Sequence, residues 1–301
     1  METGTRLVSH SSCVPFSDLS SAAMPTPTRP GPAPIPRHDG TEISRSHPAR
    51  VILDRCPGDK AIADYNEAIR LDPKDAVAYN NCGNAWRAKK EHDKAIADYN
   101  EAIRLDPSIA MTYNNRGLAW NNKKEHDKAI ADYNEAIRID PKLAWAYIGR
   151  AVTLFITRRE GAIDGTKTAL AVEGWRGEVP IYAVVLGHFA AIQAGHGEQA
   201  KAFLDDAAAH CDKETWPYPI VKYLRGELDE AKLLAAAVDN DKMTEVHGYL
   251  GVDLLQKGQK GPATAHFRWV KEHGNPTFVE YIIALAELDR LEAKPLATHA
   301  P

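Results

Sequence analysis

The chain has 301 residues, 44% of them hydrophobic, with 37 basic and 41 acidic side chains and a formal net charge of −4. This is an ordinary globular composition, and the chain is long enough to bury a sizeable core. Because no basic excess draws nucleic acid or anionic lipid to the surface, we expect neither as a partner. No stretch approaches the roughly 20 apolar residues of a membrane span.

Residues 1–57 are rich in Pro, Ser and Thr, as in "PTPTRPGPAPIP". A composition without helical or strand periodicity predicts a disordered tail, which ends in a degenerate first helix that contains Pro48. The first residues lack the continuous apolar run of a secretory signal. As it stands, the sequence therefore predicts a cytoplasmic protein.

One phrase, "DKAIADYNEAIRLDP", begins at Asp59, at Asp93 and, with a single Leu-to-Ile change, at Asp127. The copies are 34 residues apart, and a period of 20–50 residues is typical of a stacked solenoid. Apolar residues recur within the phrase at i, i+1, i+4, i+7 and i+8, which form one face of an α-helix. The closing Asp-Pro pair ends that helix.

A second helical pattern precedes two of the copies and places an aromatic residue, a glycine and a tryptophan on one face. Glycine inside a helix costs ~1 kcal/mol relative to alanine. Its recurrence at Gly83 and Gly117 therefore predicts a close approach of the partner helix.

These residues resemble the tetratricopeptide repeat signature in type and spacing. The matching positions are Tyr79, Gly83, Trp86, Ala95, Tyr99, Ala102 and Pro107, and then Tyr113, Gly117, Trp120, Ala129, Tyr133, Ala136 and Pro141. The resemblance implies an all-α fold, a right-handed α-α superhelix of stacked helix pairs. We assign residues 58–174 to this array.

Residues 175–293 continue as degenerate helix pairs with a capping helix, "TFVEYIIALAELDRLE", and residues 294–301 form a short flexible tail. Leu186-Gly187 and Leu250-Gly251 repeat the feature seen at Gly83. The segment from Trp216 to Leu291 resembles the C-terminal part of the bacterial NlpI-type repeat lipoproteins. That resemblance implies an envelope adaptor of peptidoglycan hydrolases or a protease, located in the periplasm or at the outer membrane if the N-terminus is misassigned.

The sequence offers little for catalysis. Ser108 is the one serine after Asp59, and Cys82 falls on a packed helix face, where a thiol is usually a small core residue. His92 and His126 lie one repeat apart, about 10 Å, which is too far for a shared metal ion. We therefore predict a non-enzymatic protein with no cofactor and no metal site.

The first helix of each pair is expected to face an inner, concave surface. The predicted partner-binding residues on it change from polar to apolar along the array: Asn80, Asn84, Arg87, Asn114, Asn115, Leu118, Asn121, Trp145, Ile148, Val152 and Phe155. Amide side chains there can hydrogen-bond to a peptide backbone, whereas Trp145 and Phe155 have packing against the next helix pair as an alternative. We predict a scaffold that binds a protein or peptide partner, with a structural homodimer as the alternative.

Overall fold

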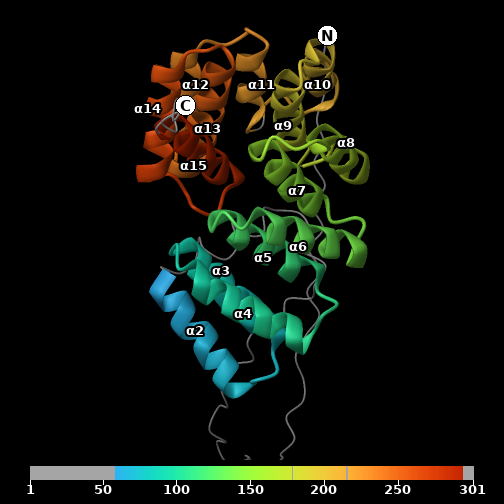
Figure 1. Cartoon of the computed structure of the whole chain (residues 1–301), viewed down its shortest axis with the longest axis vertical. Helices are drawn as coiled ribbons and strands as arrows, with labels where there is room; N and C mark the ends of the chain where they lie inside the picture. The colour runs from blue at the N-terminus through green and yellow to red at the C-terminus, as the bar shows by residue number, and fades with distance from the viewer. Residues whose placement is uncertain (1–57, 178, 215, 294–301) are drawn as a thin grey trace, which may run out of the picture. The chain divides into compact units, whose positions relative to one another are not determined.

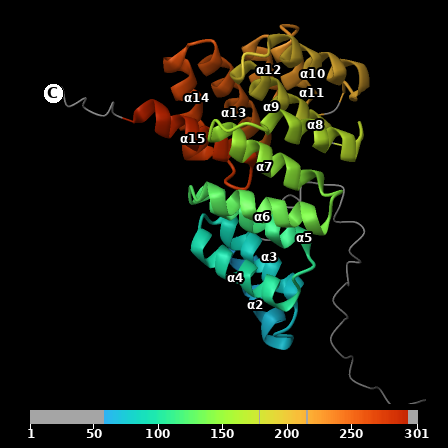
Figure 2. The ribbon, with the colours of Figure 1, turned by 45° about the vertical axis from the view of Figure 1, so that its right-hand side comes forward.

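The computed structural model describes residues 58–177, 179–214 and 216–293, and this part of the chain contains fourteen helices and no strand (Figures 1 and 2). The predicted N-terminal tail, the degenerate first helix and the C-terminal tail lie outside these residues. The all-α fold class is confirmed. None of the described helices is both long enough and apolar enough to cross a membrane.

The array consists of antiparallel helix pairs, in which the repeated phrase forms the second helix. Its helices are α2 (Gly58–Leu71), α3 (Ala76–Ala88), α4 (His92–Leu105), α5 (Ala110–Asn122), α6 (His126–Ile139), α7 (Ala144–Ile156) and α8 (Ala162–Glu173). The helix α4 ends where the backbone becomes extended at Asp106, directly before Pro107. At the start of α3, the Asp75 carboxylate accepts hydrogen bonds from the amides of Val77 and Ala78.

Helix pairs continue through the second half of the described chain. They are α9 (Val179–Gln193), α10 (Gly197–His210), α11 (Tyr218–Leu224), α12 (Glu230–Ala236), α13 (Asn240–Gln256), α14 (Lys260–His273) and α15 (Val279–Glu292). The pair α11 and α12 is short, with seven residues in each helix. A large apolar core runs from α5 through these helices to α15.

Glycine and aromatic side chains set the spacing between the paired helices. A Cβ atom on Gly83 would lie 2.6 Å from the Tyr99 ring, and one on Gly117 would lie 2.8 Å from the Tyr133 ring. No Cβ atom fits at such distances, so the predicted close approach of the partner helix is confirmed. Gly187 and Gly251 have the same relation to aromatic rings on α10 and α14.

Ion pairs also recur from one helix pair to the next. Lys89 pairs with Asp59, Lys123 with Asp93, and Arg159 with Asp127. Each pair has at least one well-exposed member, and exposed ion pairs contribute only about 0–1 kcal/mol. The burial of apolar and aromatic side chains between the pairs is therefore the larger source of stability.

The C-terminal helix α15 returns to the array. It packs against α13 and α14 and also contacts α7 (Figures 1 and 2). Just before α15, the backbone carbonyl of Thr277 accepts a hydrogen bond of 3.0 Å from the Arg87 guanidinium on α3. The chain thus brings its last helix against the ends of helices near its beginning.

Candidate partner-binding surface

The predicted binding residues lie on α3, α5 and α7, and their exposure falls along each helix. At the N-terminal ends, Val77 is 52% exposed, and Met111 and Trp145 are partly exposed at the equivalent positions. Toward the C-terminal ends of their helices, Arg87 and Phe155 are buried. Val77, Met111 and Trp145 thus form an accessible row at the N-terminal ends of these helices, which we call the N-terminal row.

Nine of the eleven predicted binding residues are buried, and only Asn80 and Trp145 are partly exposed. The buried ones are Asn84, Arg87, Asn114, Asn115, Leu118, Ile148, Val152, Phe155 and Asn121. They pack between helices, and of the nine only Asn121 and Phe155 also border a pocket on the described part of the chain. Their contact with a partner stays a prediction.

The buried amides hold neighbouring helices together. Asn84 Oδ1 accepts a hydrogen bond of 2.8 Å from the Tyr99 hydroxyl, joining α3 to α4. Asn115 Nδ2 donates to Asn80 Oδ1 at 3.1 Å, joining α5 to α3. Their hydrogen-bonding capacity, which the sequence suggested for a peptide backbone, is used within the fold.

Asn121 joins three helices. Its Nδ2 donates to Thr153 Oγ1 on α7 at 2.7 Å and to the Tyr133 hydroxyl on α6 at 3.2 Å. Its Oδ1 lies 3.2 Å from His126 Nδ1, which fits a histidine that carries its proton on that nitrogen. This side chain is therefore a structural link between successive repeats.

Trp145 lies against the following helix pair. Its ring centroid is 5.8 Å from that of Tyr182 on α9, at a tilt of 47°, and it packs against the main apolar core. Phe155 belongs to that core. Both residues thus contact neighbouring helices, and Trp145 keeps part of its surface accessible.

Three cationic residues occupy the turn that follows the first helix of successive pairs. Lys90, Lys124 and Arg158 are 34 residues apart and have φ values of 62°, 63° and 58°. We call them the turn cations. All three side chains reach α15.

Each turn cation has a different partner on α15. The Lys90 ammonium lies 4.8 Å from the centre of the Tyr281 ring, which is a cation–π contact. Lys124 forms an ion pair with Asp289 at 2.5 Å. The Arg158 guanidinium donates to both carboxylate oxygens of Glu287 at 2.9 Å.

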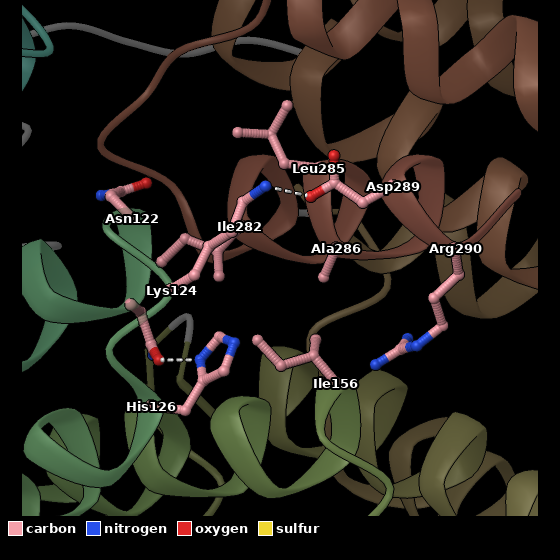
Figure 3. Close-up of a pocket in the computed structure, with 10 residues that line it drawn as sticks. Asn122, Lys124, His126, Ile156, Ile282, Leu285, Ala286, Asp289 and Arg290 are labelled. Atoms are coloured by element: carbon pink, nitrogen blue, oxygen red, sulfur yellow. Dashed lines mark hydrogen bonds and ion pairs between the residues drawn. The ribbon is translucent and has the colours of Figure 1, made fainter. Parts of the chain in front are cut away.

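The contact between α15 and the array borders a small, partly open cavity of about 140 Å³ (Figure 3). Ile156 of α7 faces Ile282 and Ala286 of α15 across it, and Lys124 reaches over to Asp289. His126 also lines the cavity, and burial together with the nearby Arg159 lowers its pKa. The apolar sides of α15 and the array therefore meet without filling the space between them.

The two described cysteines are poor nucleophiles at neutral pH. Cys82 is buried against α2, and this burial raises the pKa of its thiol to about 12. Burial raises the pKa of the Cys211 thiol to about 11. In the described residues, no group of three or more His, Cys, Asp or Glu side chains is arranged to hold a metal ion.

The repeat part of the chain matches a known family. Residues 76–109 and 110–143 each match the model of the tetratricopeptide repeat, and residues 59–86 match a second model described as a TPR repeat. The predicted tetratricopeptide repeats are thereby confirmed over residues 59–143.

Solved structures agree with this fold. A tetratricopeptide repeat protein from Parabacteroides merdae is 15% identical, with 79% of this chain and 96% of that chain covered and a TM-score of 0.51. PilW, a type IV pilus biogenesis factor, is 17% identical over 74% of this chain and 89% of that chain, with a TM-score of 0.49. PilF of Pseudomonas aeruginosa is 15% identical over 79% and 94%, with a TM-score of 0.48. At 15% identity, the similarity to the Parabacteroides merdae protein shows the solenoid fold alone.

The turn cations were not predicted from the sequence, although one signal was present. Lys90, Lys124 and Arg158 share the 34-residue spacing, whereas the corresponding turns after α9, α11 and α13 carry Gly195, Gly226 and Gly258. Cations in place of the usual glycine mark these three turns as different. The identity of their partner, α15, is not encoded in the spacing.

Proposed function

We propose that this protein is a non-enzymatic interaction scaffold that binds a protein or peptide partner through the N-terminal row. The observation that supports this is the contrast between equivalent positions. The stacking positions repeat, as with Tyr99 and Tyr133, while the row changes from Val77 to Met111 to Trp145. Side chains that vary on a constant scaffold are the ones free to determine specificity.

The row favours a partner segment with apolar side chains. Val77 is one of only four large hydrophobic residues exposed in the described chain, and exposed apolar side chains that lie together commonly mark interaction sites. The expected ligand is therefore a segment that places apolar side chains on α3, α5 and α7 in turn.

A finer proposal concerns the cellular role. The resemblance of residues 216–291 to NlpI-type lipoproteins supports an adaptor for envelope hydrolases or a protease. The alternative is a structural homodimer. Sedimentation over a range of concentrations tests it, because a protein that stays monomeric at all concentrations would exclude the homodimer.

The row can be tested with a matched pair of valines. A peptide ligand is first selected by display on the immobilised full chain, and its Kd is measured by fluorescence anisotropy. We expect Val77→Asp to weaken binding at least tenfold, because the new carboxylate must be desolvated against an apolar ligand. Val238→Asp should leave Kd unchanged, since Val238 is 77% exposed but lies after α12, outside the array.

Trp145→Ala should also weaken binding while the helical circular dichroism signal is kept. Equal affinities for the wild type, Val77→Asp and Val238→Asp would contradict the proposed role of the row.

A further inference from the structure

The turn cations adopt a backbone conformation that favours glycine. A positive φ near 60° is unfavourable for a residue with a Cβ atom, and glycine is the usual solution at the end of a helix. The later turns use it, with φ values of 78°, 76° and 78° at Gly195, Gly226 and Gly258. The backbone at the three turn cations is therefore strained, and the contacts of their side chains must offset this strain.

Neighbouring cations in the same turns have a different use. Lys123 pairs with Asp93 on α4 and so joins two helices of the array, whereas Lys124 pairs with Asp289 on α15. Arg159 pairs with Asp127 on α6, whereas Arg158 pairs with Glu287 on α15. Of two adjacent positive charges, one thus links neighbouring repeats and the other contacts an acidic side chain of α15.

The ionic edge of the contact with α15 is partly open to solvent. The Lys124–Asp289 pair is open to solvent, with side chains 66% and 54% exposed, so salt screens it. Glu287 is 2% exposed and bound by Arg158 and Arg290, and a buried ion pair gains little because its members lose hydration. The pocket beside Ala286 leaves part of the contact unfilled, whereas Ile282 and Leu288 of α15 are buried in the apolar core.

We propose that the edge formed by the turn cations is a docking site for an acidic amphipathic helix of a partner protein, and that α15 occupies this site in the isolated chain. The inference rests on the proposed scaffold role and adds a second surface with its own class of ligand. The partner helix carries apolar residues that match Ile282 and Ala286. It carries carboxylates one turn further on, where Glu287 and Asp289 stand.

Charge complementarity supports this ligand. Each repeat contributes one turn cation. The three cations contact one aromatic ring and two carboxylates on α15. A helix that places its apolar face on a hydrophobic surface and its charges on the rim is a common mode of recognition. A partner helix with a bulkier residue in the place of Ala286 would also fill the cavity and so outcompete α15.

The probe for this site is a fluorescent peptide that copies residues 277–293, and the full chain is the receptor. Asp289→Lys places a like charge against Lys124, which weakens the hold on the chain's own α15 but leaves the turn cations intact. We expect this variant to bind the peptide at least tenfold more tightly than the wild type does. Adding Lys124→Asp should abolish that gain, whereas adding Lys123→Asp should preserve it.

Hydrogen exchange gives an independent readout that does not need the peptide. We expect faster exchange in α15 of the Asp289→Lys variant and restored protection in the charge-swapped Lys124→Asp, Asp289→Lys double variant. Restored protection also shows that the variants fold. If Asp289→Lys unfolds the chain, Asp289→Asn takes its place, with a smaller expected gain in peptide binding.

Three results would overturn the inference. They are peptide binding that Asp289→Lys or its substitute does not improve, equal effects of the Lys123 and Lys124 reversals, and dimerisation of the opened variant, which would make a second copy the occupant. None of these tests involves the N-terminal row. A failed Val77→Asp test would therefore count against the row alone, and a failed peptide test against the turn cations alone.

Discussion

At the scale of single residues, glycines that face aromatic rings control how closely paired helices approach. Gly187 on α9 lies against Phe203 on α10, where a Cβ atom would be 2.5 Å from the ring. Phe203 is buried, so its ring has no free space into which it can move. The usual gain in helix stability from replacing glycine is therefore reversed at this position.

We predict that Gly187→Ala lowers the free energy of unfolding by about 1–3 kcal/mol, the usual cost of overpacking a core. Gly197→Ala is the control, because Gly197 begins α10 in the same pair and a Cβ atom added to it would meet nothing within 4 Å. Urea unfolding followed by circular dichroism measures both. The explanation fails if the two variants are equally stable.

A buried carboxyl group makes stability depend on pH. Glu280 is buried on α15 and accepts a hydrogen bond from the Tyr249 hydroxyl. Burial raises its pKa from 4.5 to about 7. Between these two pKa values the folded state therefore keeps a proton that the unfolded state releases. The stabilisation that comes from protonated Glu280 is complete below pH 4.5 and is lost as the pH rises through about 7.

We predict that Glu280→Gln, which keeps the acceptor but cannot ionise, is more stable than the wild type above pH 7 by roughly 1–3 kcal/mol. The difference should shrink as the pH falls toward 4.5. Unfolding curves of the two proteins between about pH 4.5 and 8 measure it, and contributions from the histidines cancel in the comparison. A difference that stays constant with pH would rule out this group as the cause.

At the scale of helices, buried amides connect one pair to the next. Asn121 on α5 hydrogen-bonds to α6 and α7. Its neighbour Asn122 donates only to the Leu118 carbonyl of its own helix. Two adjacent asparagines thus differ in whether they link helices.

We predict that Asn121→Ala lowers the free energy of unfolding by about 1–3 kcal/mol, because Thr153 and Tyr133 lose a buried partner. Asn122→Ala should change it by less than about 0.5 kcal/mol. Chemical denaturation of the two variants measures both changes in the free energy of unfolding. If Asn122→Ala is as costly, the link between repeats is not the reason.

The helices themselves follow closely from the sequence because their signals are local. The apolar periodicity, the Asp-Pro ends and the glycine–aromatic spacing all lie within one pair, and the structure has helices where these signals predict them. Arg116, which stands where the repeat signature has leucine, is accommodated by an ion pair with Asp132 and a hydrogen bond to Asn100. Those partners were not evident from the repeat signature.

At the scale of the whole described chain, the sequence predicted the solenoid but not the return of α15. The Arg158–Glu287 pair joins residues 129 apart, and the Arg87–Thr277 hydrogen bond joins residues 190 apart. Repeat periodicity carries no information on contacts at such separations. The candidate site was therefore placed on the expected helices, while the burial of Arg87 and Asn121 could not be foreseen.

The glycine–aromatic pairs have a consequence for how this chain can change in length. Tyr99, Tyr133, Phe203 and Phe267 each follow their glycine by 16 residues, whereas the segments between pairs differ in length. A residue inserted into either helix between the glycine and the ring would rotate the ring away from its glycine by about 100°, since a helix has 3.6 residues per turn. In these four pairs, changes of length are therefore tolerated between pairs but not between a glycine and its ring, which makes the helix pair the unit by which this part of the chain can be lengthened, shortened or recombined.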